Sequence, residues 1–287
     1  MAGNQPYLFI TKTKIMKLKI VLIKIMFIFT LNITYSQNNL KDTLKYEIIY
    51  DFSYQENKED SKNIKSEQMV LKVSKSFSHY ISYNNLQQTN MYKGIQNSGE
   101  TSIIKSRPKT EFLFSLIKDY NNDKIIFSDM IGLDVYSFEK PTIKLDWVLN
   151  NEETEILGYK CKKATTTFAG RDYIAWYSTE ISISDGPYKF QGLPGLIFSI
   201  YDTKNHYKFT ISKISKEKSI FDTNDEIFNP IKITEKEFKE LKRKFREKPS
   251  SMLNSGGMTF PKELLDMGDK RAKERLKYEN NPLELTD

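Results

Sequence analysis

Apolar side chains recur at every second position along several short stretches of the chain. Between residues 44 and 54 they fall at Tyr46, Ile48, Tyr50, Phe52 and Tyr54. Successive side chains of a strand point to opposite faces, so this alternation predicts a half-buried strand. Similar patterns predict strands at residues 68–73, 77–83, 111–118, 124–128, 135–139, 142–149, 155–168, 172–179, 196–201 and 206–214.

The spacing of these stretches is typical of consecutive antiparallel strands and not of alternating strands and helices. Gly170 and Arg171 separate two alternating runs, which predicts a hairpin. Residues 84–108 are polar and show no sustained period, which predicts a long loop. The sheet is therefore expected to span residues 44–214.

Two helices are predicted after the sheet, within residues 232–278. The first covers residues 234–247 with Thr234 as its N-cap, and the second covers 261–278 and begins at Pro261. The predicted fold class is mainly β (β-rich α+β): a curved antiparallel sheet, with a half-barrel as one form of it, and two C-terminal helices. Residues 37–287 are expected to form a single β-rich domain.

The start of the chain carries the pattern of a targeting segment. Basic residues at 17–24 precede an apolar run at 25–31, and the small residues Thr34 and Ser36 suit a signal peptidase. Residues 1–36 are thus predicted to be an upstream extension and a cleavable signal peptide. The alternative, a transmembrane anchor, is disfavoured because Asn32 ends the apolar run short of the ~20 residues that a spanning helix needs.

Charge and cysteine content narrow the partners and the compartment. Of 44 basic residues, five lie in residues 1–36, which leaves 39 against 37 acidic residues and a nearly balanced mature chain. Nucleic acid is therefore not an expected partner. Cys161 is the single cysteine, so an intramolecular disulfide and a lipoprotein anchor are both excluded. We expect an exported protein, periplasmic, outer-membrane-associated or secreted, without a transmembrane span in the mature chain.

Candidate catalytic chemistry is sparse. His79 and His206 lie in no metal-binding spacing, so no metal or cofactor is predicted. Cys161 and His206 are kept as a nucleophile and base pair, because such groups need only be close in space. A carboxylate pair is the other possibility, and the candidates lie near a Gly- and Pro-rich segment: Glu180, Asp185 and Asp202.

Residues 157–202 contain four motifs in a fixed order. They are Gly-Tyr-Lys-Cys at 158–161, Ala-Trp-Tyr at 175–177, Gly-Pro-Tyr-Lys-Phe at 186–190 and Gly-Leu-Pro-Gly-Leu-Ile at 192–197. This segment is similar to the GLPGLI family of exported Bacteroidetes proteins. The resemblance implies a role in the bacterial envelope, and it brings no established activity, catalytic residues or cofactor.

The motif segment has two interpretations. Gly186, Pro187, Gly192 and Gly195 predict tight structural turns, and this is the favoured interpretation. The alternative is a recognition surface, because loops often carry binding residues. Its candidate residues are the aromatic and apolar side chains Trp176, Tyr177, Tyr188, Phe190, Leu193 and Pro194.

The preferred functional hypothesis is a noncatalytic envelope protein whose aromatic sheet face binds an apolar ligand or a protein partner. One alternative is an exported hydrolase that uses Cys161 and His206 or a carboxylate pair. Another is an assembly or accessory partner of an outer-membrane transporter.

Overall fold

The computed structural model describes residues 40–98, 108–223, 230–253 and 260–286. The predicted extension and signal peptide at residues 1–36 lie outside the described residues. Residues Leu40–Asp287 form one compact unit, distinct from Met1–Asn39. The division into a leader and a single domain at residue 37 stays a prediction.

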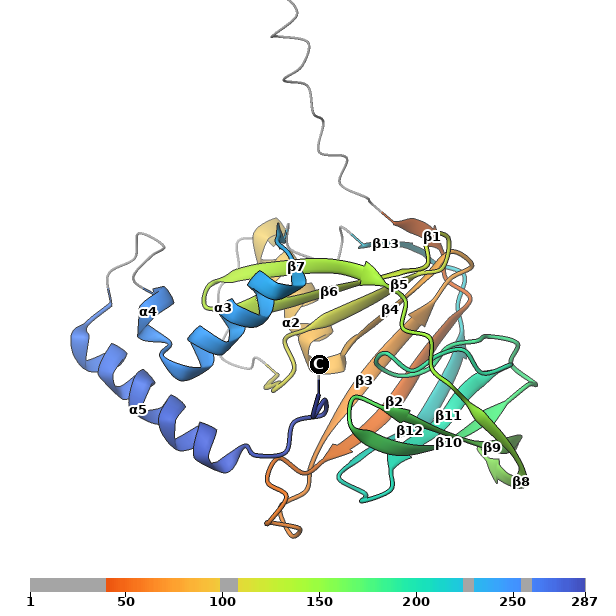
Figure 1. The fold of residues 1–287 in the computed structure, drawn as a ribbon. Coiled ribbons are helices and arrows are strands. Elements are labelled where there is room, and N and C mark those ends of the chain that lie inside the picture. Colours follow the sequence, from red (N-terminus) through yellow and green to blue (C-terminus); the bar gives the residue numbers. More distant parts are fainter. Residues whose placement is uncertain (1–39, 99–107, 224–229, 254–259, 287) are drawn as a thin grey trace, which may run out of the picture. The chain divides into compact units, whose positions relative to one another are not determined.

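A sheet of twelve strands dominates the described residues, in the order β14-β7-β6-β5-β4-β3-β2-β12-β11-β10-β9-β8 (Figure 1). Neighbouring strands pair antiparallel, except that β14 pairs parallel with β7. The fold class is thus confirmed as mainly β. The strands are β2 (Tyr46–Tyr54), β3 (Lys65–Val73), β4 (Phe77–Ser82), β5 (Ser115–Asp119), β6 (Lys124–Ile131), β7 (Asp134–Pro141), β8 (Val148–Ile156), β9 (Tyr159–Phe168), β10 (Arg171–Ser178), β11 (Leu196–Asp202), β12 (Tyr207–Lys216) and β14 (Ile231–Lys232).

The main core lies on one face of this sheet. Tyr50, Phe52 and Tyr54 of β2 are buried there, as their alternation predicts. The opposite face is covered near β4 by a helix, α2 (Tyr83–Ser98), and by a small sheet of β1 (Lys41–Thr43) and β13 (Ile220–Asp222). Because both faces of β4 are covered, all six of its residues are buried.

Two sequence predictions about elements are wrong. Residues 84–108 were expected to be a loop, yet α2 begins at Tyr83 and lies against β3 and β4. The strand expected at 142–149 begins only at Val148. Before it, Ile143, Leu145 and Trp147 alternate because they pack on the core from an irregular segment, without pairing in the sheet.

The C-terminal helices agree with their predicted bounds. Helix α3 (Glu235–Glu247) begins after Thr234, whose side chain forms a capping box with Glu237. It lies against β6 and β7, and Phe238 contacts aromatic rings of both strands. The short α4 (Ser250–Leu253) and then α5 (Lys262–Tyr278) follow, and both contact α3 (Figure 1).

Candidate functional site

A cavity of about 410 Å³ lies between the core face of the sheet and the C-terminal helices. This volume is within the ~300–1,000 Å³ usual for small-molecule sites. Strands β2, β3, β4, β6 and β12 supply one side, and α3, α5 and residues 279–283 supply the other. The segment before β5 adds Glu111, Phe112, Leu113 and Phe114 to the lining.

Aromatic rings form the inner walls of the cavity. Phe52 of β2 stacks on its cross-strand neighbour Phe209 with ring centroids 4.2 Å apart. Phe112 meets Phe52 at 5.3 Å and the edge of Tyr54 at 5.0 Å. These arrangements are among the favoured geometries for aromatic pairs, so the rings stabilise one another along the walls.

Charged groups gather at the mouth of the cavity. The carboxylate of Glu279 accepts from Arg246 at 3.1 Å and lies 3.5 Å from the Arg275 guanidinium. Lys65 pairs with Glu56 at 2.7 Å, and Glu111 also lines the opening. Burial raises the pKa of Glu279 above its ordinary value, against the opposing effect of both arginines, and Glu56 adds to the rise.

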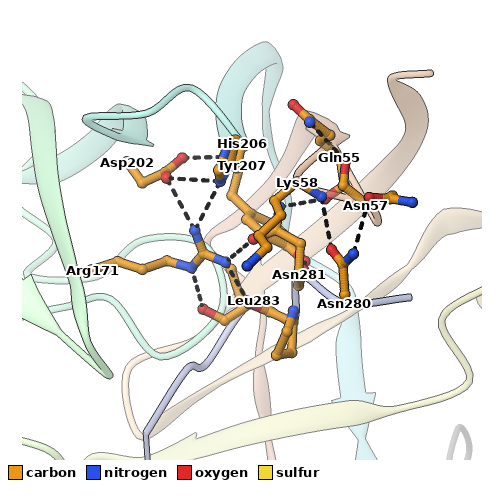
Figure 2. A network of polar contacts seen from close by, with 11 residues as sticks. Gln55, Asn57, Lys58, Arg171, Asp202, His206, Tyr207, Asn280, Asn281 and Leu283 are labelled. Atoms are coloured by element: carbon orange, nitrogen blue, oxygen red, sulfur yellow. Dashed lines mark hydrogen bonds and ion pairs between the residues drawn. The ribbon is translucent and has the colours of Figure 1, made fainter. Parts of the chain in front are cut away.

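Arg171 fixes the C-terminal segment that completes this wall (Figure 2). Its guanidinium donates to the Leu283 carbonyl at 3.0 Å, to the Pro282 carbonyl at 2.6 Å and to Asn281 Oδ1 at 2.7 Å. It also pairs with the buried Asp202 at 3.2 Å. All of these acceptors are oxygens that suit a planar fork of donors, so Arg171 has a structural role.

Four further hydrogen bonds hold the same segment. Asn281 donates to the Gln55 carbonyl at 2.6 Å and accepts at its own carbonyl from the Tyr207 hydroxyl. Farther along, the Glu284 carboxylate accepts from Lys189 at 2.5 Å and from the Tyr188 hydroxyl at 2.8 Å. The cavity wall is therefore tied to β2, to β12 and to the motif segment.

The structure does not bring Cys161 and His206 together. Cys161 lies in β9 near the residues that pair with Tyr177, whereas His206 contacts Arg171 at the other end of the β9–β10 hairpin. Burial raises the pKa of the Cys161 thiol to about 11, which disfavours the reactive thiolate. Burial also lowers the pKa of His206.

The predicted carboxylates do not meet in a cleft either. Asp185 is buried against Lys118, and Asp202 is buried against Arg171. Glu180 is exposed and accepts from the Lys160 backbone. The carboxylates that do line the cavity, Glu56, Glu111, Asp129 and Glu279, were not identified from the sequence.

The glycines of the motif segment occupy positions where a side chain would collide or where the backbone has a positive φ. A Cβ on Gly195 would lie 2.1 Å from the Ser178 carbonyl oxygen, and one on Gly186 would lie 2.8 Å from Ile197. Gly192 has a φ of +96°, which other residues rarely adopt. Pro187 follows Gly186 in the first of these turns, and its carbonyl accepts from the Phe190 backbone.

The candidate recognition residues divide by burial. Tyr177, Tyr188, Phe190 and Leu193 are buried in the main core, Trp176 is half-buried and Pro194 is exposed. Tyr188 also lines the cavity. A recognition role for this set stays a prediction.

The described residues show neither a metal-binding cluster nor a membrane-spanning helix. Within ranges 40–98, 108–223, 230–253 and 260–286, no three His, Cys, Asp or Glu side chains are grouped so that they could hold a metal ion. Among the helices of the described part of the chain, none is long and apolar enough to cross a membrane.

The fold and site define a mainly β domain in which a large sheet and C-terminal helices enclose a cavity with aromatic walls and a charged mouth. A family model described as N-glycanase peptide, N-terminal domain, matches residues 52–237. The chain therefore belongs to the PNGase F-II N-terminal domain family.

Solved structures agree with this assignment at the level of the fold. Two structures of PNGF-II, in space groups C2 and P21, each match 71% of this chain with a TM-score of 0.52. Their sequences are 16% and 17% identical to it. The chain spans about a third of the length of those proteins, 33% and 34%. No curated protein matches the chain in sequence.

Family membership corrects two predictions. The resemblance to the GLPGLI family is wrong, because the matching model covers residues 52–237 and so includes the motif on which that resemblance was based. The hypothesis of an uncharacterised noncatalytic binding module of the envelope is wrong as well, since the family is that of the N-terminal domain of an N-glycanase. The hydrolase alternative agrees better with the family, and the structure places Cys161 and His206 apart.

Proposed function

We propose that the chain acts in the hydrolytic release of N-linked glycans from polypeptides. The bond between glycan and asparagine would be hydrolysed at the mouth of the cavity. Membership of an N-glycanase domain family supports this reaction class. The observation that carries the proposal is the half-buried Glu279 carboxyl, which lies beside two guanidinium groups at the opening of an aromatic cavity.

Hydrolysis of the amide that joins a glycan to asparagine has three requirements. A base must activate water, an acid must protonate the departing nitrogen, and positive charge must stabilise the carbonyl oxygen in the transition state. Glu279 is the proposed acid, because burial raises the pKa of its carboxyl. Glu111 is the proposed base, and Arg246 supplies the positive charge at the same mouth.

The test is glycan release by the purified full chain from a peptide that carries one N-linked glycan. Mass spectrometry would follow conversion of the glycosylated asparagine to aspartate. Glu279→Gln removes the proposed acid, so we expect the rate to fall roughly 100-fold or more. The wild-type rate should also decrease as the pH rises through the elevated pKa of Glu279, because only the protonated carboxyl donates.

A matched control is Glu240→Gln. Glu240 pairs with Lys244 four residues on, as Glu279 pairs with Arg275, but it lies on the exposed face of α3 away from the cavity. Its rate should equal that of the wild type. The proposal fails when the wild-type chain releases no glycan, or when Glu279→Gln and Glu240→Gln release it equally fast.

We infer that this reaction takes place outside the cytoplasm, in the periplasm, at the outer membrane or in the medium. The basic and apolar pattern of residues 17–36 supports export. The partner that the proposed reaction implies is a glycosylated polypeptide. Fractionation of cells that express the full chain tests this inference. Recovery of full-length protein in the cytoplasm alone would overturn it.

A further inference from the structure

One hydroxyl group on the wall of the cavity has no protein partner among the described residues. Tyr80 of β4 is only 1% exposed, lines the cavity, and its hydroxyl makes no hydrogen bond within the described part of the chain. Burial raises the pKa of Tyr80 well above its ordinary value, so the group stays protonated and can donate. Buried polar groups in proteins nearly always have a partner.

The neighbouring polar side chains are already committed. Ser78 and Ser82 lie on the same face of β4, and they donate to Asp185 and Glu67 respectively. The nearby hydroxyls of Tyr50 and Tyr188 donate to the Ile197 carbonyl and to Glu284. Tyr80 therefore differs from each of these groups, because it lines the cavity and its buried hydroxyl has no hydrogen-bond partner among the described residues.

Half-buried aromatic rings lie close to Tyr80. The centroid of Phe114 is 6.4 Å from that of Tyr80, and Phe112 meets Phe114 edge to face at 5.9 Å. Both phenylalanines line the cavity. A pyranose ring has an apolar face of C–H bonds and a rim of hydroxyl groups, so it suits a place where aromatic rings adjoin a hydrogen-bond donor.

We propose that Tyr80, Phe112 and Phe114 form a subsite for one pyranose ring of a saccharide, with the ring against the phenylalanines and one of its oxygens at the Tyr80 hydroxyl. This subsite rests on the proposed function, because it takes the sugar part of the glycosylated substrate. A purely apolar ligand fits less well. It would leave the Tyr80 hydroxyl unpaired and would bring no polar groups to Glu56 and Arg246 at the mouth.

The experiment measures binding of N,N′-diacetylchitobiose to the full chain by isothermal titration calorimetry. Tyr80→Phe removes only the hydroxyl, so we expect the dissociation constant to rise about 5- to 10-fold, as for the loss of one hydrogen bond. The variant should fold as well as the wild type, because the hydroxyl makes no bond within the described residues. A thermal melt checks this.

The matched control is Tyr173→Phe. The Tyr173 hydroxyl is also without a partner among the described residues, and the residue is also 1% exposed, but it does not line the cavity. Its affinity should equal that of the wild type. The subsite is overturned when the wild type binds no saccharide, when Tyr80→Phe binds as well as the wild type, or when both variants lose affinity equally.

The outcome is separable from that of the proposed function. Saccharide binding that depends on Tyr80, together with no glycan release, would reject the hydrolytic function and keep the subsite. If glycan release depends on Glu279 but saccharide binding is unchanged in Tyr80→Phe, the subsite is rejected and the hydrolytic function is kept.

Discussion

Replacing Lys118 by methionine should strongly destabilise the protein. Lys118 and Asp185 form an ion pair in which both side chains are only 1% exposed. The ammonium group also donates to the carbonyl oxygens of Gly186 at 2.8 Å and Phe190 at 3.2 Å. Burial lowers the pKa of Lys118, and the charge of Asp185 opposes that effect.

Methionine has a similar length and no charge, so Lys118→Met would leave the Asp185 carboxylate buried and uncompensated. Removing one partner of a buried pair typically costs ~3–5 kcal/mol in the free energy of unfolding. Since 1 kcal/mol lowers Tm by about 2–4 °C in a domain of this size, the expected decrease in Tm is roughly 6–20 °C.

Urea unfolding followed by circular dichroism measures the free energy directly. The double variant Lys118→Met with Asp185→Asn should recover part of the loss, because it leaves no buried charge. Lys244→Met is the control, since Lys244 forms an exposed pair on α3 and should contribute less than ~1 kcal/mol. A loss of under about 1 kcal/mol in Lys118→Met, no larger than in the control, would refute the reasoning.

Further predictions concern four single positions. Gly195→Ala should destabilise by more than about 2 kcal/mol in urea unfolding, because its Cβ would meet the Ser178 carbonyl oxygen at 2.1 Å. Gly268→Ala in α5, where an added Cβ would meet no atom within 4 Å beyond its own helix backbone and chain neighbours, should instead stabilise by roughly 0.5–1 kcal/mol. Thr234→Ala removes the N-cap of α3 and should cost about 1 kcal/mol, whereas Thr234→Ser should not. Cys161 should resist alkylation at pH 8 until the protein is unfolded, as thiol labelling with mass spectrometry would show. Because burial raises the pKa of this thiol from 9.0 to about 11, the unfolded state loses its proton first as pH rises. The free energy of unfolding should therefore decrease more steeply between these two values in the wild type than in Cys161→Ala, where only the buried tyrosines still contribute to the decrease.

Local patterns predicted the regular elements well. The alternation in residues 46–54 identified β2, because one face of this strand is buried and apolar side chains occupy that face. Thr234 identified the start of α3, because capping depends on neighbours in sequence. These signals are short in range, and they do not depend on how distant segments pack.

Helix α2 was missed because its sequence is polar and has no clear apolar face. Leu86 is the buried hydrophobic residue that it contributes to the cluster with Val70 and Ile81. Two further buried residues of this helix, Gln88 and Thr89, are polar. A helix that covers a sheet with polar side chains leaves no hydrophobic period to detect.

The candidate site was missed for a different reason. Its charged mouth combines residues near 56, near 111 and near 279, which come together only through the fold. Lys58 and Asn280, for example, are hydrogen-bonded across 222 positions. The motif at 192–197 is conspicuous in the sequence, yet its two glycines have structural reasons: Gly195 packs closely against Ser178, and Gly192 has a positive φ.

The hydrogen bonds from Arg171 to residues 281–283 also bear on how the protein folds. Asn281 reaches Gln55 across 226 positions, and contacts of such separation form slowly because a long loop must close first. Strands β2, β3 and β4 are neighbours in sequence and pair early by comparison. We therefore expect the aromatic face to stay open to water and to chaperones for a time, and the cavity to be acquired as one of the last events of folding.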